Sequence, residues 1–382
     1  MSAPARTPPS RYLTRLRLTG FRNYTSAALD LDARHLVLVG HNGAGKTNLM
    51  EAISLLAPGR GLRRAAFEDL TQAGSDGGWA VAATLETPAG PVDLGTGQSP
   101  DGLGKPRRVR INGADARAVE ALGEHIRVMW LTPAMDGLFT GPAGDRRRFL
   151  DRLVLTLIPG HTASLNAYER AMRQRNRLLN ENPDRAWLDA IETEMAAHAT
   201  AVTFARADTL GHLAALLAAA GDAGPFPAAT VDLSGLEPFE TDAIQSGALE
   251  TGYIEAWRAA RPIDRAAGRT TIGPHRADLE VGHLGKGVPA RLCSTGEQKA
   301  LLIGLVLAHA QLVADMSGLP PILLLDEIAA HLDENRRAGL FDRLDELGVQ
   351  CVMTGTDAIL FEALGDRALR VRVEDARLTP MP

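Results

Sequence analysis

The segment VLVGHNGAGKT, residues 37–47, decides the fold of this 382-residue chain. Three apolar residues run into a glycine-rich loop that ends in Lys46 and Thr47, and this pattern predicts a strand, a phosphate-binding loop and a helix. The glycines allow backbone N–H groups to wrap phosphates, while the lysine and the hydroxyl suit terminal phosphates and Mg²⁺. We therefore expect an ATP and Mg²⁺ site that contains Gly40, His41, Asn42, Gly43, Ala44, Gly45, Lys46, Thr47 and Asn48.

A second motif lies far downstream, where the apolar run 321–325 ends in Asp326 and Glu327. The run predicts a buried strand. Asp326 would hold Mg²⁺ together with Thr47, directly or through water, and Glu327 would orient and deprotonate an attacking water. The expected catalytic residues are Lys46, Asp326 and Glu327, and most of the chain separates the first from the other two. One ATPase fold is therefore expected to be split by an insertion about as long as a domain.

The segment CSTGEQK, residues 293–299, immediately precedes an apolar helical run. It resembles the signature motif of ATP-binding-cassette proteins. That resemblance implies that Ser294, Gly296 and Gln298 belong to the nucleotide site of the opposite subunit, so that ATP closes a homodimer. A purely structural reading is also open, in which Ser294 caps the helix and Glu297 completes a capping box, and both readings can hold at once.

Two further segments follow the acidic motif. Residues 330–333 resemble the D-loop that crosses the dimer interface in the same superfamily. The next strand-like run, 349–353, is not followed by the switch histidine that many relatives have. Sensing of the γ-phosphate would therefore rest on Thr354, on Thr356 or on a group that the sequence does not identify.

The order of elements predicts an α/β fold, an ABC-type P-loop ATPase head assembled from both ends of the chain with an inserted, mostly helical lobe. Alternating apolar residues near the N-terminus predict strands, and helical spacing rich in alanine, leucine and arginine begins near residue 146. The predicted boundaries are 1–140 for the first half of the head, 141–262 for the helical lobe and 263–382 for the second half.

Composition narrows the class of protein. The net charge is −5, so affinity for nucleic acid must come from local patches. The two cysteines are far apart and lack the spacing of a disulfide framework or a zinc site, which fits a cytoplasmic setting. The apolar run 300–314 contains His309 and Gln311 and is short for a bilayer, so we expect a buried helix and no membrane partner.

Motifs spread over residues 12–357 resemble the RecF family: LTGFRNY (18–24), GAGKTNLMEAI (43–53), RRRFLD (146–151), QRN (174–176), GRTT (268–271), GPHR (273–276) and STGEQK (294–299). The resemblance implies a slow, DNA-dependent ATPase that dimerises with ATP on duplex DNA near single-strand gaps and junctions. It also implies action with RecO and RecR in loading the RecA recombinase, during recombinational repair and replication restart. By the same analogy, Arg22 and Asn23 would lie near the nucleotide base or the phosphate loop.

Three arginine clusters are candidate DNA-binding residues, because they could neutralise phosphates without reading bases. Each cluster alone also fits an ordinary solvated surface. The clusters are Arg60, Arg63 and Arg64; Arg107, Arg108 and Arg110; and Arg170, Arg173 and Arg177.

Other ATPases share some of these motifs. A transporter subunit would carry the phosphate loop, the signature and the acidic strand, but its two halves usually lie closer in sequence, so it remains the alternative. An SMC-type structural protein would need far longer coiled coils, and a nuclease-fused ATPase would need a further domain after residue 328.

Overall fold

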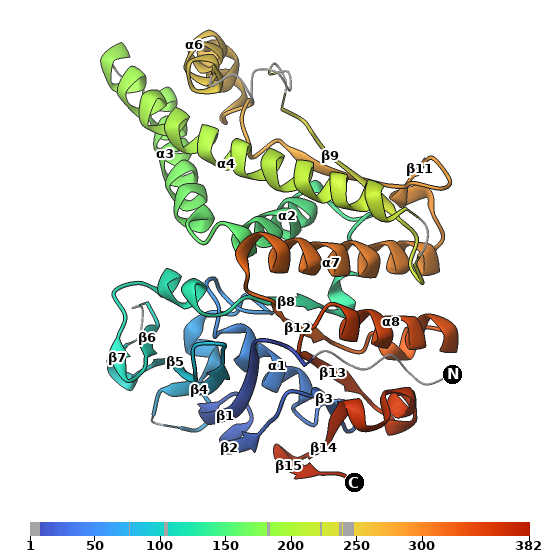
Figure 1. The fold of residues 1–382 in the computed structure, drawn as a ribbon. Coiled ribbons are helices and arrows are strands. Elements are labelled where there is room, and N and C mark those ends of the chain that lie inside the picture. Colours follow the sequence, from blue (N-terminus) through green and yellow to red (C-terminus); the bar gives the residue numbers. More distant parts are fainter. Residues whose placement is uncertain are drawn as a thin grey trace. The chain divides into compact units, whose positions relative to one another are not determined.

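The computed structural model describes residues 8–75, 77–102, 106–181, 184–221, 224–236, 239 and 248–382. The chain divides into two compact units. The first contains residues 1–136, 223–226 and 302–382, and the second contains residues 137–222 and 227–301 (Figure 1). Both ends of the chain therefore contribute to the first unit, as the separated motifs predict.

A largely parallel sheet forms the centre of the first unit. Its order is β15 (Arg377–Pro380), β14 (Ala368–Glu374), β3 (His35–Val39), β13 (Cys351–Gly355), β12 (Ile322–Leu325) and β8 (Val128–Leu131). All neighbours are parallel except β14 and β15. Every residue of β3, β13, β12 and β8 is buried, which is characteristic of parallel strands covered on both faces.

A second, antiparallel sheet completes the core of this unit. Its order is β2 (Tyr24–Asp30), β1 (Tyr12–Phe21), β4 (Trp79–Glu86), β5 (Val92–Gln98), β6 (Arg108–Ile111) and β7 (Ala114–Asp115). Helix α1 (Lys46–Ser54) contributes Leu49, Met50 and Ile53 to one hydrophobic core shared with residues of both sheets. The phosphate-loop helix is thus fixed by packing along its length.

The remaining regular elements of the first unit are helical. Helix α8 (Glu334–Glu346) follows the acidic motif. Short 3-10 helices lie at Phe67–Leu70, Pro100–Gly102, Val119–Glu124, Pro133–Met135, Ala329–His331 and Ala358–Arg367.

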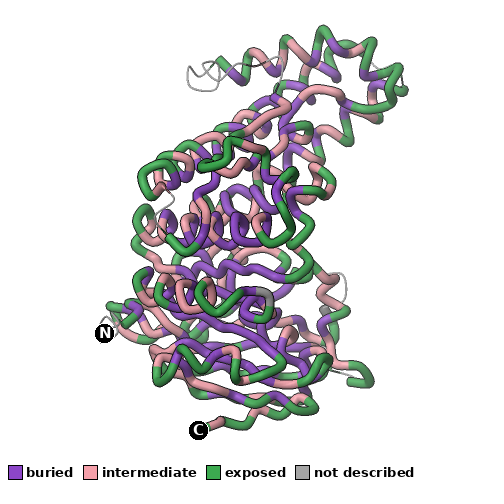
Figure 2. Tube along the Cα trace, turned by 90° about the vertical axis from the view of Figure 1, so that its right-hand side faces the viewer, coloured by how far each residue is buried: buried purple, intermediate pink, exposed green. Residues whose placement is uncertain are grey.

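The second unit is mostly helical, as expected for the inserted lobe. It contains α2 (Ala143–Leu157), α3 (His161–Glu181), α4 (Arg185–Ala220), α6 (Leu249–Ala267), the 3-10 helix Ala290–Leu292 and the antiparallel sheet of β11 (Val288–Pro289), β10 (Asp278–His283) and β9 (Ala229–Ser234). Buried and exposed residues alternate along the helices, whose inner faces form a core around Tyr168, Met195 and Trp257 (Figure 2). Strand β9 lies within residues 221–238, a stretch of the sequence rich in glycine and proline.

The boundaries of the compact units differ from the predicted domains after residue 262. Residues 263–301 were expected with the second half of the head, but they cluster with the helical unit. The physical reason is that β10 pairs with β9 along six residues and packs against α2. The signature segment therefore begins in the second unit.

Helix α7 (Thr295–Ser317) starts at the signature segment, and its later part belongs to the first unit. Among the described helices, it alone is long and apolar enough to cross a bilayer. Most of its apolar window, 61%, is buried within the protein, which agrees with the predicted core helix.

Candidate functional site

The predicted phosphate-binding loop connects β3 to α1. Gly43 and Gly45 have φ values of +86° and +114°, a region that favours glycine. A Cβ on Gly45 would lie 2.7 Å from Nδ2 of Asn23 and 2.8 Å from Oη of Tyr24. The Tyr24 hydroxyl also donates a hydrogen bond to the Gly45 carbonyl at 3.1 Å. Glycine is therefore required at position 45 both by its conformation and by the close packing of β2 against the loop.

Lys46 begins α1 and folds back over the loop. Its ammonium donates hydrogen bonds to the carbonyl oxygens of Gly40 at 2.6 Å and His41 at 3.0 Å. Burial lowers the pKa of this ammonium, whereas the nearby carboxylates of Glu327 and Asp326 oppose that change. The N-cap glycine offers no side-chain acceptor, so the first backbone N–H groups of α1 face the loop without a side-chain cap. A cation and backbone donors thus meet where an anionic phosphate chain could bind.

Thr47 and Asp326 lie together although they are far apart in the sequence. The Thr47 hydroxyl is 3.2 Å from each carboxylate oxygen of Asp326. A hydroxyl and a carboxylate are the oxygen donors that Mg²⁺ takes beside substrate phosphates, so this pair fits the expected cation. The described residues contain no cluster of three or more histidine, cysteine or acidic side chains suited to a metal, which leaves a cation here dependent on further phosphate or water oxygens.

Thr354 joins the two acidic residues of the site. Its buried hydroxyl donates to Oδ1 of Asp326 at 2.7 Å and accepts the backbone N–H of Glu327 at 2.9 Å. Glu327 has φ +54°, an uncommon conformation for a residue other than glycine. Thr356, the other threonine considered from the sequence, is exposed. The sequence offers no reason to prefer either threonine, whereas in the structure only Thr354 of the two is buried and bonded to the acidic motif.

A polar network joins α1 to the turn between β1 and β2 beside the loop. Buried Glu51 accepts two hydrogen bonds of 2.9 Å from the Arg22 guanidinium and a third, of 3.1 Å, from Arg63. Asn48 accepts from Arg63 at 2.6 Å and donates to Asn23 at 2.8 Å. Arg22 and Asn23 therefore lie beside the phosphate loop, and Arg63 joins them. Sequence reasoning assigned no role to Glu51, although an acid inside the apolar run of a core helix is itself a signal for a buried ion pair.

The expectation that Arg107 contacts DNA is wrong. Its guanidinium is buried and donates to the carbonyl oxygens of Leu55, Ala57 (2.7 Å) and Gly59 (3.2 Å), just after the C-terminus of α1. Burial lowers the pKa of Arg107 to about 10. A cation at this position satisfies carbonyl groups that the end of a helix leaves without partners, so Arg107 stabilises the fold and cannot reach a phosphate.

The other arginine candidates are exposed, although several have partners. Arg110 pairs with Asp115 at 2.7 Å, and Arg173 lies 3.7 Å from Glu169. The Arg60 guanidinium lies 5.9 Å from the centre of the Phe67 ring. The exposed set is Arg60, Arg63, Arg64, Arg108 and Arg110 in the first unit, and Arg170, Arg173 and Arg177 on α3 in the second.

The signature segment forms the capping box that the sequence allowed. The Ser294 hydroxyl and backbone N–H both lie 2.9 Å from one carboxylate oxygen of Glu297, whose own N–H points to the Ser294 hydroxyl at 3.4 Å. Lys286 contacts the same carboxylate, and together with Ser294 it lowers the pKa of Glu297 to about 2. Gln298 is buried and donates to the Cys293 carbonyl at 2.9 Å. Ser294 and Gly296 are nevertheless exposed. The capping box is therefore compatible with contact between these two residues and a nucleotide on a partner subunit.

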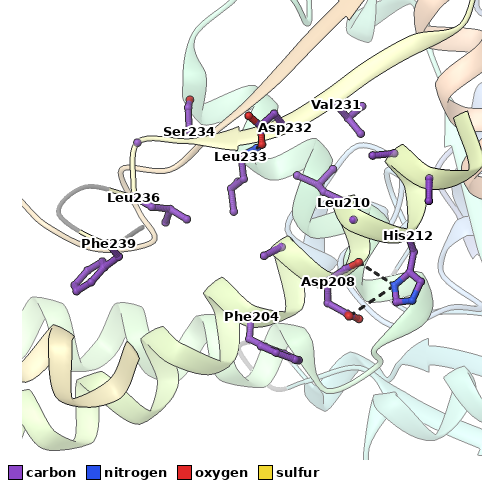
Figure 3. A pocket seen from close by; sticks show the side chains of 15 residues that line it. Phe204, Asp208, Leu210, His212, Val231, Asp232, Leu233, Ser234, Leu236 and Phe239 are labelled. Atoms are coloured by element: carbon purple, nitrogen blue, oxygen red, sulfur yellow. Dashed lines mark hydrogen bonds and ion pairs between the residues drawn. The ribbon is translucent and has the colours of Figure 1, made fainter. Parts of the chain in front are cut away.

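A cavity of about 540 Å³ lies in the second unit between α4 and β9 (Figure 3). Phe204, Leu210, Leu233, Leu236 and Phe239 supply much of its apolar lining. None of the residues predicted from the sequence lines it. The residues predicted to bind and hydrolyse nucleotide lie instead at the carboxyl ends of β3, β12 and β13, the edge at which open α/β sheets bind ligands.

Comparisons with known proteins agree with this arrangement of motifs. A family model described as the RecF/RecN/SMC N terminal domain matches residues 12–379. A DNA replication and repair protein RecF from Rhizobium meliloti is 54% identical over 97% of this chain and 100% of its own length. The RecF protein of Allorhizobium ampelinum is 56% identical over 96% of this chain and 98% of its own. Such relatives do not support the transporter alternative.

Solved structures show the same fold at low sequence identity. One, described as the recombination mediator protein RecF-ATPrS in the RecFOR pathway, has a TM-score of 0.82 at 19% identity and covers 99% of this chain and 100% of its own. An SMC head bound to the C-winged helix domain of ScpA has a TM-score of 0.54 at 17% identity, with 97% of each chain covered. The α/β head assembled from both ends of the chain is thus confirmed. With this fold and identities above 50% over nearly the whole length, the chain belongs to the RecF family.

Proposed function

We propose that this chain is an ATP-dependent DNA-binding protein of replication and recombinational repair. The observation that carries the proposal is the meeting of Thr47 with Asp326, next to Lys46 and the glycine-rich loop. It is supported by the relatives described as DNA replication and repair proteins and by the similar folds described as RecF with ATP.

The site residues divide the work of binding and hydrolysing ATP. The loop from Gly40 to Thr47 and the N-terminus of α1 would bind the phosphates through backbone N–H groups, and Lys46 would move from its carbonyl partners onto the terminal phosphates. Thr47 and Asp326 would hold Mg²⁺, which when bound offsets negative charge on the phosphates. Glu327 would accept a proton from the attacking water.

Hydrolysis acts as a slow, DNA-dependent switch in this proposal. Closure of an ATP-bound homodimer would place the exposed Ser294 and Gly296 against the partner's nucleotide, and Gln298 would hold the start of α7 in place. Hydrolysis would then remove the phosphate that joins the subunits and release the dimer.

DNA contact would come from the exposed arginines and not from bulk charge. Their guanidinium groups suit phosphates of duplex DNA and of single-strand junctions, with no base readout required. As partners we propose RecR and RecO, in keeping with the description of similar structures in the RecFOR pathway, and a cytoplasmic location. The proposed DNA-binding residues are Arg60, Arg63, Arg64, Arg108, Arg110, Arg170, Arg173 and Arg177.

Light scattering of a Glu327→Gln variant tests this function. With Mg-ATP and a gapped duplex, the protein should reach twice its monomer mass of 40.7 kDa and retain DNA in a salt-sensitive way. Because the carboxamide cannot take up the proton, its dimer should outlast that of the wild type. The matched control is Ser294→Arg, which should bind ATP and remain a monomer. A Glu327→Gln protein that stays monomeric with ATP and DNA would refute the ATP-gated clamp.

A further inference from the structure

Thr354 occupies a position that the order of strands makes central. Strand β13 lies between β3, which leads into the phosphate loop, and β12, which leads into Asp326 and Glu327. Thr354 pairs in register with Leu38 of β3, at the carboxyl end of the sheet. Its hydroxyl therefore lies between the two motifs that bind and hydrolyse nucleotide in the proposed function.

The hydrogen bonds of this hydroxyl leave it no free donor. A threonine hydroxyl has one O–H donor, and in Thr354 that donor goes to Oδ1 of Asp326 at 2.7 Å. The same oxygen accepts the N–H of Glu327 at 2.9 Å. Contact with a phosphate oxygen would require Thr354 to release the carboxylate. The buried hydroxyl is thus built to hold the acidic motif and not to sense a phosphate directly.

The two hydrogen bonds of Thr354 restrain the side chain of Asp326 and the backbone of Glu327. The Asp326 carboxylate also meets the Thr47 hydroxyl, so the bond from Thr354 limits how the carboxylate can rotate relative to Thr47. Glu327 has φ +54°, and such conformations persist only where neighbouring structure fixes them. One side chain on a third strand thereby restrains both the metal-binding pair and the backbone that carries the base.

We propose that Thr354 is a positioning residue for ATP hydrolysis: it orients Asp326 toward the cation shared with Thr47 and holds Glu327 in its left-handed conformation. This inference rests on the proposed ATPase function. Removing the hydroxyl should weaken the coupling of Mg²⁺ to nucleotide binding and slow hydrolysis, while the phosphate loop and Lys46 keep their contacts with nucleotide.

Thr354→Val replaces the hydroxyl with a methyl group of similar size, and Thr354→Ser retains it. Each variant is tested by two measurements. Steady-state kinetics give kcat, with KM for ATP beside it, and titration with a fluorescent ATP analogue gives the magnesium ratio, which is the nucleotide affinity with Mg²⁺ divided by that with EDTA. For the valine variant we expect kcat to fall 10- to 100-fold and the magnesium ratio to fall about tenfold, with affinity in EDTA unchanged. The serine variant should remain within about threefold of the wild type in both.

Thr203→Val is the matched control. Thr203 is also fully buried, and its hydroxyl pairs with Tyr253 at 2.7 Å in the second unit. This variant loses a comparable buried hydrogen bond, so it should reduce stability without changing the magnesium ratio. If Thr354→Val does not fold, Thr354→Cys replaces it, because the weak S–H donor should give the same two losses.

The outcomes separate this inference from the proposed function. A wild-type protein that neither binds nor hydrolyses ATP would refute the proposed function itself. If the wild type is active and Thr354→Val matches Thr203→Val in kcat and magnesium ratio, the role of Thr354 is structural and the inference is wrong. Failure of Thr354→Ser to restore both quantities would also overturn it.

Discussion

Alanine at Gly45 should be far more damaging than alanine at Gly43, although both glycines belong to the same loop. Gly43 has φ +86° and a Cβ there would find no atom within 4 Å, so only backbone strain of about 1–2 kcal/mol is expected. At Gly45 the same kind of strain adds to contacts of 2.7 Å with Asn23 and 2.8 Å with Tyr24. Tyr24 is fully buried and cannot move aside without displacing its neighbours.

The sizes of these effects add up to a measurable difference. The hydrogen bond from Tyr24 to the Gly45 carbonyl would be lost, at a cost of about 1 kcal/mol, and relief of the overlap adds about 1–3 kcal/mol. We therefore expect Gly45→Ala to lower the free energy of unfolding by about 3–6 kcal/mol. The two variants should differ by at least about 2 kcal/mol.

Hydrogen exchange of the α1 backbone amides, measured without nucleotide, reports how much each variant destabilises the helix next to the loop. Urea denaturation gives the total loss of stability, and titration with ATP gives the loss of binding. Gly43→Ala should keep the exchange protection of α1 close to the wild-type level. Equal protection in the two variants would refute the argument that β2 packs on the loop closely enough to require glycine.

Two further predictions concern buried groups of the second unit. Arg175→Met should lower the free energy of unfolding in denaturant by about 3–5 kcal/mol, because the buried carboxylates of Glu192 and Asp264 lose the cation that they share. The control, Arg173→Met on the exposed face of α3, should change it by less than about 0.5 kcal/mol. Similar losses in the two variants would contradict the buried network. Burial lowers the pKa of His275 from its ordinary 6.5 to about 4. As the pH falls, this imidazole is therefore protonated in the unfolded chain before it is protonated in the folded protein. The free energy of unfolding should fall by roughly 3 kcal/mol between pH 6.5 and pH 4. Unfolding midpoints measured across this range should fall less steeply in His275→Gln, and identical slopes would contradict a buried neutral imidazole.

The arrangement of the candidate site was predictable where its residues are contiguous in sequence. The residue spacing within the glycine-rich loop and within the acidic motif is enough to predict the chemistry of each. The fold brings Thr47 and Asp326 together as expected. The contacts made from other strands were not predictable in this way, because the sequence named Thr354 and Thr356 alike and only as candidates for sensing the γ-phosphate. Thr354 reaches Asp326 and Glu327 only because β13 is inserted between β3 and β12, and strand order is not encoded in the spacing of either motif.

The arginine clusters were predicted from charge alone, although the alternation of side chains along a strand would have separated Arg107 from its neighbour. Side chains alternate between the two faces of a strand, so neighbouring Arg107 and Arg108 cannot share a surface. In the structure Arg107 and Val109 are buried, while Arg108 and Arg110 are exposed. The buried arginine then meets carbonyl groups beyond the end of α1, which ties β6 to the helix that follows the phosphate loop. Counting positive charges along the chain therefore overestimates a DNA-binding surface, and the periodicity of the element that carries them decides which charges can reach a phosphate.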